Sequence, residues 1–214
     1  MANRTAPWRE VHPSKPAPPE RAAPPLRWDV PLSLVATALG AALTAACHRR
    51  WAHAGPGSSQ RALFDGACHV GTALAVASPV SPYVRDPGAF LRVAVASALL
   101  IDLDHVVAAR SLRLTRWMTM PARPPSHSLL APLLLATLAE RLAPERHLGL
   151  AAVLGLGSHL LRDLYTGGVP LLHPRRVISL SPNVVIPVLA LLALSSRSGA
   201  RRRLGTRLRR LLYR

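Results

Sequence analysis

Six apolar blocks decide what this chain of 214 residues can fold into. A helix that spans a bilayer needs about 20 mostly apolar residues, whereas blocks of about 10–14 also suit the core of a soluble protein. Soluble core helices would show polar faces at a helical period, and most of these blocks do not. We therefore predict an all-α fold, a polytopic membrane bundle of about six helices. The blocks are 30–47, 66–80, 89–109, 128–143, 148–161 and 184–195.

Composition divides the chain into four parts. Residues 1–27 are basic and rich in proline, which predicts a disordered tail. Residues 28–62 predict an extra N-terminal membrane helix and loop, and residues 63–195 hold the remaining blocks as one membrane domain. In residues 196–214 leucine and arginine side chains separate onto two faces of a helix, which predicts a basic amphipathic tail.

Charge indicates the partners. The formal net charge is +17, from 27 Lys and Arg against 10 Asp and Glu, and most of it lies in the tails and loops. This distribution is typical of a multi-pass protein of the cell membrane. We expect membrane lipids as partners, with anionic lipid at the C-terminal tail. A basic tail alone specifies no nucleic acid, so none is predicted.

Ionisable residues interrupt or border these blocks at four places, in stretches such as "IDLDH" (101–105) and "GSHLLRDLYTGGVPLLHP" (157–174). Such residues are costly in hydrocarbon and mostly functional, so each place is a candidate site. If the helices alternate in direction, the start of the second block, the end of the third, the start of the fourth and the end of the fifth meet at one membrane face. The residues are His69, Asp102, Asp104, His105, His127, His159 and Asp163.

Their spacing predicts metal ligation near that face. Asp102 and His105 are three residues apart, and His159 and Asp163 are four apart, so each pair shares a helix face. Several imidazoles with carboxylates suit zinc, or another borderline divalent ion such as manganese, better than calcium. The predicted ligands are His69, Asp102, His105, His127, His159 and Asp163.

Other residues have predicted roles around the ion. Asp104 would point about 200° away from Asp102 on a helix, so it suits a place behind the ligands or at a second ion. Because the set contains no glutamate, the general base would be Asp104, Asp163 or a metal-bound hydroxide. Arg123 and Arg162 could hold an anionic substrate.

Plainer interpretations stay open. A lone histidine such as His69 is most often a hydrogen-bonded structural residue. Either Asp104 or Asp163 could pair with a neighbouring arginine instead of a metal. Ser126 follows two prolines and fits a helix N-cap.

At these residues the chain resembles the YdjM-like inner-membrane family of membrane-bound metal-dependent hydrolases, over about residues 63–194. The resemblance implies hydrolysis without naming the bond. Our leading hypothesis is a hydrolase in which a metal-activated water cleaves a phosphoester or lipid-related substrate, a small molecule or a lipid. Four positions depart from the family pattern: Ile101 replaces a proline, Ser126 a threonine, Arg162 an apolar residue, and His173 stands where an aromatic residue is common. None of these removes a ligand. The matching stretches are His69, "IDLDH" (101–105), "RPPSHS" (123–128) and "SHLLRDLYTGGVPLLHP" (158–174).

Two other functions use the same residues. A membrane metal transporter or sensor would place the site near the bilayer midplane and often has inverted repeats. The sequence has no such repeat and its ligands stand near the ends of blocks, which favours the enzyme. A non-catalytic membrane protein with a structural metal would differ in ligand count and would lack an open coordination position.

Overall fold

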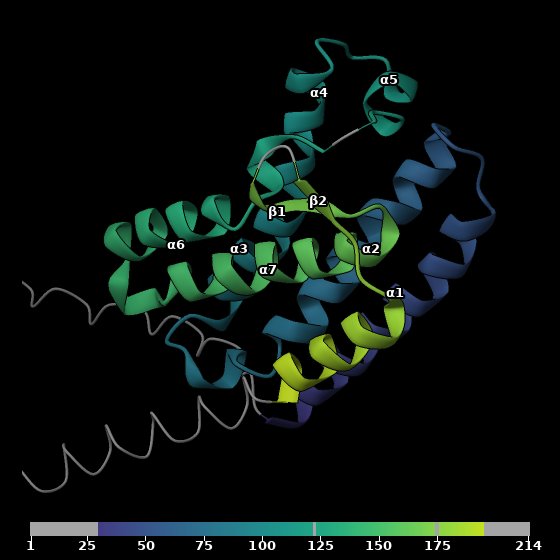
Figure 1. Ribbon diagram of the computed structural model, residues 1–214. Helices are drawn as coiled ribbons and strands as arrows, with labels where there is room; N and C mark the ends of the chain where they lie inside the picture. The colour runs from purple at the N-terminus through teal and green to yellow at the C-terminus, as the bar shows by residue number, and fades with distance from the viewer. Residues whose placement is uncertain (1–29, 122, 174–175, 195–214) are drawn as a thin grey trace, which may run out of the picture.

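The computed structural model describes residues 30–121, 123–173 and 176–194, and helices build most of this part of the chain (Figure 1). An antiparallel hairpin of β1 (Val169–His173) and β2 (Arg176–Ile178) follows the last labelled helix, and the apolar helix Pro182–Leu194 comes after it. The α-helices are α1 (Val30–His53), α2 (Ser59–Ala77), α3 (Pro87–Leu100), α4 (Asp104–Ala108), α5 (Leu114–Met118), α6 (Leu130–Leu142) and α7 (Leu148–Thr166). The 3₁₀ turns are η1 (Ser81–Tyr83), η2 (Ile101–Leu103), η3 (Pro125–His127) and η4 (Pro144–Arg146).

The fold is mostly helical, as predicted, with two corrections. The block 89–109 is not one span, because α3 ends at Leu100 and η2 and α4 follow it. The hairpin is the other correction to an all-α fold. Helix α7 ends at Thr166, and Gly168 then adopts a positive φ of 81° that only glycine accepts readily. This turn leads the backbone into β1.

Length limits what the helices can do in a bilayer. Among the described residues α1 alone is long and apolar enough to cross a membrane by length and composition. Helices α3 and α6 have 14 and 13 residues, fewer than the about 20 that a simple span needs. A multi-pass arrangement therefore stays a prediction. Both predicted tails, 1–27 and 196–214, lie outside the described residues.

Helix α7 lies at the centre of the bundle, in contact with α2, α3 and α6. A β-carbon at Gly155 would overlap the carbonyl oxygen of Ala94, so the backbones of α7 and α3 are in direct contact there. Apolar side chains around Phe90 and Leu154 fill one part of the interior, and Leu160 and Leu164 pack with Val185 in another. This packing puts the polar C-terminal half of α7 inside the protein.

The hairpin fixes the turn that precedes α6. The backbone N–H of Leu129 donates to the carbonyl oxygen of Leu171 in β1 over 3.0 Å, and the N–H of Gly168 donates to the carbonyl oxygen of Asp163 over 2.8 Å. These bonds hold η3 beside the end of α7. His127 at the end of η3 is thereby brought to the polar residues of α7.

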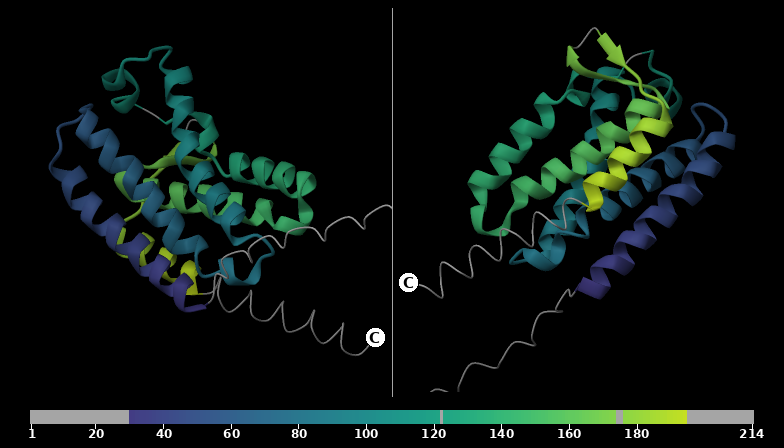
Figure 2. Two further views of the ribbon diagram at one scale, coloured as in Figure 1. Left: turned by 180° about the vertical axis from the view of Figure 1, so that it is seen from behind. Right: turned by 60° about the horizontal axis from the view of Figure 1, so that its bottom comes forward.

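Helix α6 lies along the edge of the bundle next to α7 (Figure 2). Its leucines face outward and are exposed. The outer sides of α1 and of the helix Pro182–Leu194 are also apolar. Exposed residues include Leu130, Leu133, Leu134 and Leu138 on α6, Leu34, Val35 and Leu39 on α1, and Ile186, Leu191 and Leu194 on the last helix. Apolar patches of this kind are unusual on a monomeric soluble protein.

Candidate metal centre

Four separate segments bring the predicted ligands into one cluster. Helix α2 carries His69, the turn η2 carries Asp102, and α4 carries Asp104 and His105. Turn η3 carries His127, and α7 carries His159 and Asp163. The three side chains of His69, His127 and His159 are completely buried, as is Asp163. The geometry of the cluster decides which atoms could share an ion.

Two imidazoles and two carboxylates converge most closely. The Nε2 atoms of His127 and His159 are 3.3 Å apart. Asp102 Oδ1 lies 3.4 Å from the first and 3.5 Å from the second. Asp163 Oδ2 lies 3.0 Å from His159 Nε2 and 3.8 Å from His127 Nε2. Asp102, His127 and His159 are a set of three whose atoms could hold an ion. A tetrahedron with metal–ligand bonds of about 2.0–2.1 Å has edges of about 3.3–3.4 Å, and the five distances given above for the four atoms lie around that value. We call the four atoms the ligand quartet.

Hydrogen bonds on the far side of each ring orient the lone pairs. His159 Nδ1 lies 2.6 Å from the carbonyl oxygen of Ala98, which can only accept, so we assign the proton to Nδ1. His127 Nδ1 lies 3.2 Å from Asp104 Oδ2 and is assigned the same way. Both Nε2 atoms then face the quartet. A carboxylate or carbonyl behind a histidine ligand is the usual arrangement at metal sites.

The pKa shifts of Asp104 and His127 indicate that this region favours a cation. Burial would raise the pKa of Asp104, but hydrogen bonds from His105, His127 and Ser126 hold it well below its usual range. Burial alone would lower the pKa of His127, but hydrogen bonds to Asp102 and Asp104 raise it to about 9. In the metal-free protein His127 therefore keeps a proton at neutral pH. A divalent ion would take the place of that proton.

One buried carboxylate oxygen supports the same fit. Asp163 Oδ2 is buried and makes no hydrogen bond, although His159 Nε2 is 3.0 Å away. With the His159 proton on Nδ1, two electron-rich atoms face each other, which a shared cation would stabilise. Arg123 NH1 lies 2.8 Å from the same oxygen and already supplies positive charge there. The donor types and their spacing fit a divalent ion.

His105 and Asp104 form a neighbouring group. His105 Nδ1 lies 2.9 Å from Asp104 Oδ1 and 3.7 Å from Asp102 Oδ1. Together with His127, His105 and Asp104 are a second set of atoms that could hold an ion. Ser126 donates its hydroxyl hydrogen to Asp104 and caps no helix, since η3 starts after Pro124. The N-cap interpretation of Ser126 is therefore wrong.

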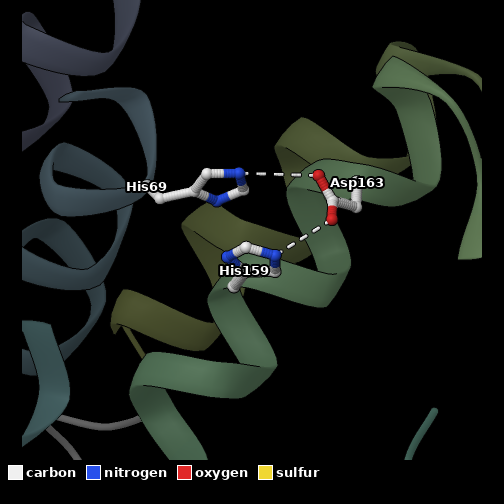
Figure 3. Close-up of side chains that lie close together, drawn as sticks. All are labelled: His69, His159 and Asp163. Carbon is white, nitrogen blue, oxygen red and sulfur yellow. Dashed lines mark ion pairs between the residues drawn. The ribbon is translucent and has the colours of Figure 1, made fainter. Parts of the chain in front are cut away.

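His69 lies beside His159, and both histidines face Asp163 (Figure 3). One carboxylate oxygen of Asp163 faces His159, and the other, Oδ1, lies 3.5 Å from His69 Nε2. The two imidazole rings stack with centroids 3.7 Å apart. These three residues are a further set whose atoms could hold an ion.

The two predicted substrate arginines occupy different places. Arg123 donates from Nε to the carbonyl oxygen of Gly168 over 3.0 Å and lines a cavity of about 440 Å³. Asp102 and His105 line the same cavity, and so do apolar residues such as Trp117. Arg162 is completely buried, and the cavity lining does not include it. Substrate binding by either arginine stays a prediction.

Asp65 belongs to this region, and the sequence interpretation missed it. Its Oδ1 lies 2.6 Å from Arg162 NH1. The signal was its position four residues before His69, which puts both on one face of α2. The same spacing was used for His159 and Asp163, so it could have been applied here.

These features define a mostly helical protein with one long apolar helix and buried His/Asp groups that could hold a metal ion. A family model described as YdjM inner membrane protein matches residues 64–212, well over half of the chain. The chain belongs to this family, which confirms the resemblance found in the matching stretches of its sequence. No curated protein and no solved structure matches the chain.

Proposed function

We propose that this protein is a membrane-bound metal-dependent hydrolase that acts on a phosphoester or lipid-related substrate. The observation that carries the proposal is the ligand quartet, in which each histidine Nε2 lies 3.0–3.8 Å from both carboxylates. Zinc is the ion that fits the quartet best, and manganese is the alternative.

Membrane attachment is supported by three observations. The family is named for an inner membrane protein, α1 is long and apolar enough to span, and leucines cover the outer side of α6. Lipid tails would shield these leucines from water. We propose that the bundle sits in the cell membrane as a multi-pass protein with lipid as its surrounding partner, and with anionic lipid at the basic C-terminal tail.

The chain's own residues prepare the site for hydrolysis. Bound to the quartet, the ion would need a fifth position for water, and there it would supply Lewis acidity and make the water more acidic. Asp104 orients His127 and also His105, which lines the cavity. The pair of Asp104 and His105 can accept a proton at the cavity wall. Asp163 is the other proposed general base, because one of its oxygens faces His69 and the other faces His159.

The cavity indicates the substrate class. Its wall combines the cations Arg61 and Arg123 with apolar side chains, among them Trp51, Leu99 and Trp117. An anionic group could reach the arginines and the quartet while an apolar part rests on the wall. A phosphoester that carries an apolar group suits this surface.

The test is reconstituted hydrolysis. Protein purified in detergent and stripped with a chelator would be reloaded with zinc or manganese and assayed on a chromogenic phosphoester and on phospholipid vesicles. We expect activity only after reloading, and none from His127→Ala. The control His53→Ala removes an exposed histidine at the end of α1 and should keep full activity. Metal binding without hydrolysis of any substrate would contradict the enzyme and favour a transporter, a sensor or a structural metal.

A further inference from the structure

Arg162 is a completely buried cation beside the proposed metal centre. Its NH1 atom lies 2.6 Å from Asp65 Oδ1, 3.0 Å from His69 Nε2 and 3.9 Å from Asp163 Oδ1. Burying a guanidinium is costly unless its charge is compensated. Here the compensation comes from one imidazole nitrogen and two carboxylates, which are the atoms that bind borderline metal ions.

The placement of the guanidinium is more specific than a simple ion pair requires. Only NH1 faces the three partners, while Nε and NH2 are buried without a hydrogen-bond partner. Trp51 covers the group with its ring centroid 5.5 Å from Cζ. An arginine that served only to neutralise Asp65 could turn to satisfy more of its donors. The chain instead leaves two donors unpaired and keeps one nitrogen between Asp65, His69 and Asp163.

Asp163 connects this position to the quartet. Its Oδ2 faces His159 in the quartet, and its Oδ1 faces His69 (Figure 3). The same Oδ1 lies 3.9 Å from Arg162 NH1. A carboxylate shared in this way between two cation positions is the arrangement expected of a two-metal hydrolytic site. In this chain one of the two positions is filled by a side chain.

We propose that the guanidinium of Arg162 stands where a second metal ion would otherwise bind, so that this protein holds a single ion, in the ligand quartet. The inference rests on the metal site of the proposed function. His69 then accepts a hydrogen bond from Arg162 through Nε2 and does not ligate the ion. Its stacking on His159 makes it a positioning residue. The positive charge of Arg162 then lies beside the ion at any concentration of free metal.

Metal stoichiometry tests the proposal. Zinc or manganese per chain would be measured by elemental analysis after saturation and removal of excess metal, on the full chain in detergent. We expect about one ion in the wild type and about two in Arg162→Ala, in which the three partner atoms face an open position. Arg162→Lys keeps a cation and should hold about one. The double variant Arg162→Ala with Asp65→Ala lacks one ligand and should also return to about one.

Two further variants keep the test decisive if Arg162→Ala does not fold. Arg61→Ala removes another arginine next to Trp51, 4.1 Å from its ring, that does not approach Asp163, and it should hold about one ion. His69→Ala leaves the arginine in place and should also keep about one ion at saturation. Loss of the ion in His69→Ala would make His69 a ligand and overturn the proposal, even if Arg162→Ala does not fold.

The remaining outcomes separate this inference from the proposed function. Two ions in the wild type would overturn the role of Arg162 but leave a hydrolase intact. A folded Arg162→Ala protein that binds only one ion would do the same. No ion in the wild type would overturn both.

Discussion

His127 is bonded from both sides of its ring, and the two bonds have different consequences. Nδ1 lies 3.2 Å from Asp104 and Nε2 lies 3.4 Å from Asp102. The first bond orients the ring, and the second marks the place where a metal and a proton compete. Individual residues therefore divide into those that would touch the ion and those, such as Asp104, that hold a ligand in position.

Removal of Asp104 should weaken metal binding without abolishing it. Asp104→Ala leaves His127 without its orienting acceptor, so we expect zinc affinity to fall about 10–100-fold. His127→Ala removes a ligand and should lose binding in the same titration. Ser126→Ala removes one hydrogen bond from Asp104 and should have a smaller effect than Asp104→Ala. Wild-type affinity in Asp104→Ala would show that the carboxylate does not support the ligand.

Metal affinity should depend on pH through His127. Its pKa of about 9 in the folded protein exceeds the ordinary 6.5, so its proton stabilises the metal-free fold fully below pH 6.5. That stabilisation is lost as the pH rises through about 9. An ion must displace the same proton, so zinc affinity should rise by about tenfold per pH unit above neutrality and level off near pH 9. Competition titrations at several pH values would measure this. A constant affinity between pH 7 and pH 9 would contradict the assigned pKa.

At the scale of helices, contact between α7 and α3 sets the site. Gly155 lies against the carbonyl oxygen of Ala94, and one turn further along both helices His159 bonds to the carbonyl oxygen of Ala98. The first contact therefore controls the second. A wider spacing between the helices would release the His159 ring from its acceptor.

Two glycines of α7 provide a matched comparison. Gly155→Ala adds a methyl group that overlaps the backbone of α3, and overpacking of this kind costs about 1–3 kcal/mol. Gly157→Ala adds the same group where nothing lies within 4 Å, so it should be neutral or stabilise the helix by up to about 1 kcal/mol. Thermal unfolding in detergent would compare the two. Equal melting temperatures would mean that α3 and α7 do not touch as described.

The sequence predicts the helices better than their ends. Each of the six apolar blocks falls on helical structure, because apolar composition selects buried or lipid-facing helix. It does not show that α3 ends at Leu100 and that Asp102 lies in the 3₁₀ turn η2. The hairpin was missed because its strands have only five and three residues, too few for an alternating pattern.

The candidate site was predictable as a set of residues and not as a geometry. Helical spacing and the family motifs predicted that His159 and Asp163 belong to the site, together with the stretch 101–105. Which nitrogen faces which oxygen depends on packing between α2, α3 and α7, which no local pattern encodes. The pairing of Arg162 with Asp65 is of this kind, since the two stand on different helices.

For the whole molecule, the apolar outer faces of α1 and α6 are the main physical clue to its surroundings. Water would leave these leucines unshielded, and lipid would cover them. The buried charges lie inside the bundle, where they face one another. Such a molecule has its polar chemistry inside and its apolar surface outside, as membrane proteins do.

Topology can be measured directly. Six helical segments that all cross the membrane place both termini on the same side. Reporter fusions before residue 1 and after residue 214 should therefore report the same compartment, and a fusion at Gly57, between α1 and α2, should report the opposite one. Opposite compartments for the two termini would contradict six crossings.

The most direct test of the account is the metal content of His159→Ala and Asp163→Ala beside the wild type. Elemental analysis of the detergent-purified proteins should find a divalent ion in the wild type. We expect a sharp loss in both variants, because an incomplete ligand set leaves buried charge uncompensated. The control His53→Ala should keep the wild-type content. Wild-type metal content in both His159→Ala and Asp163→Ala would contradict the metal centre, and with it the hydrolase.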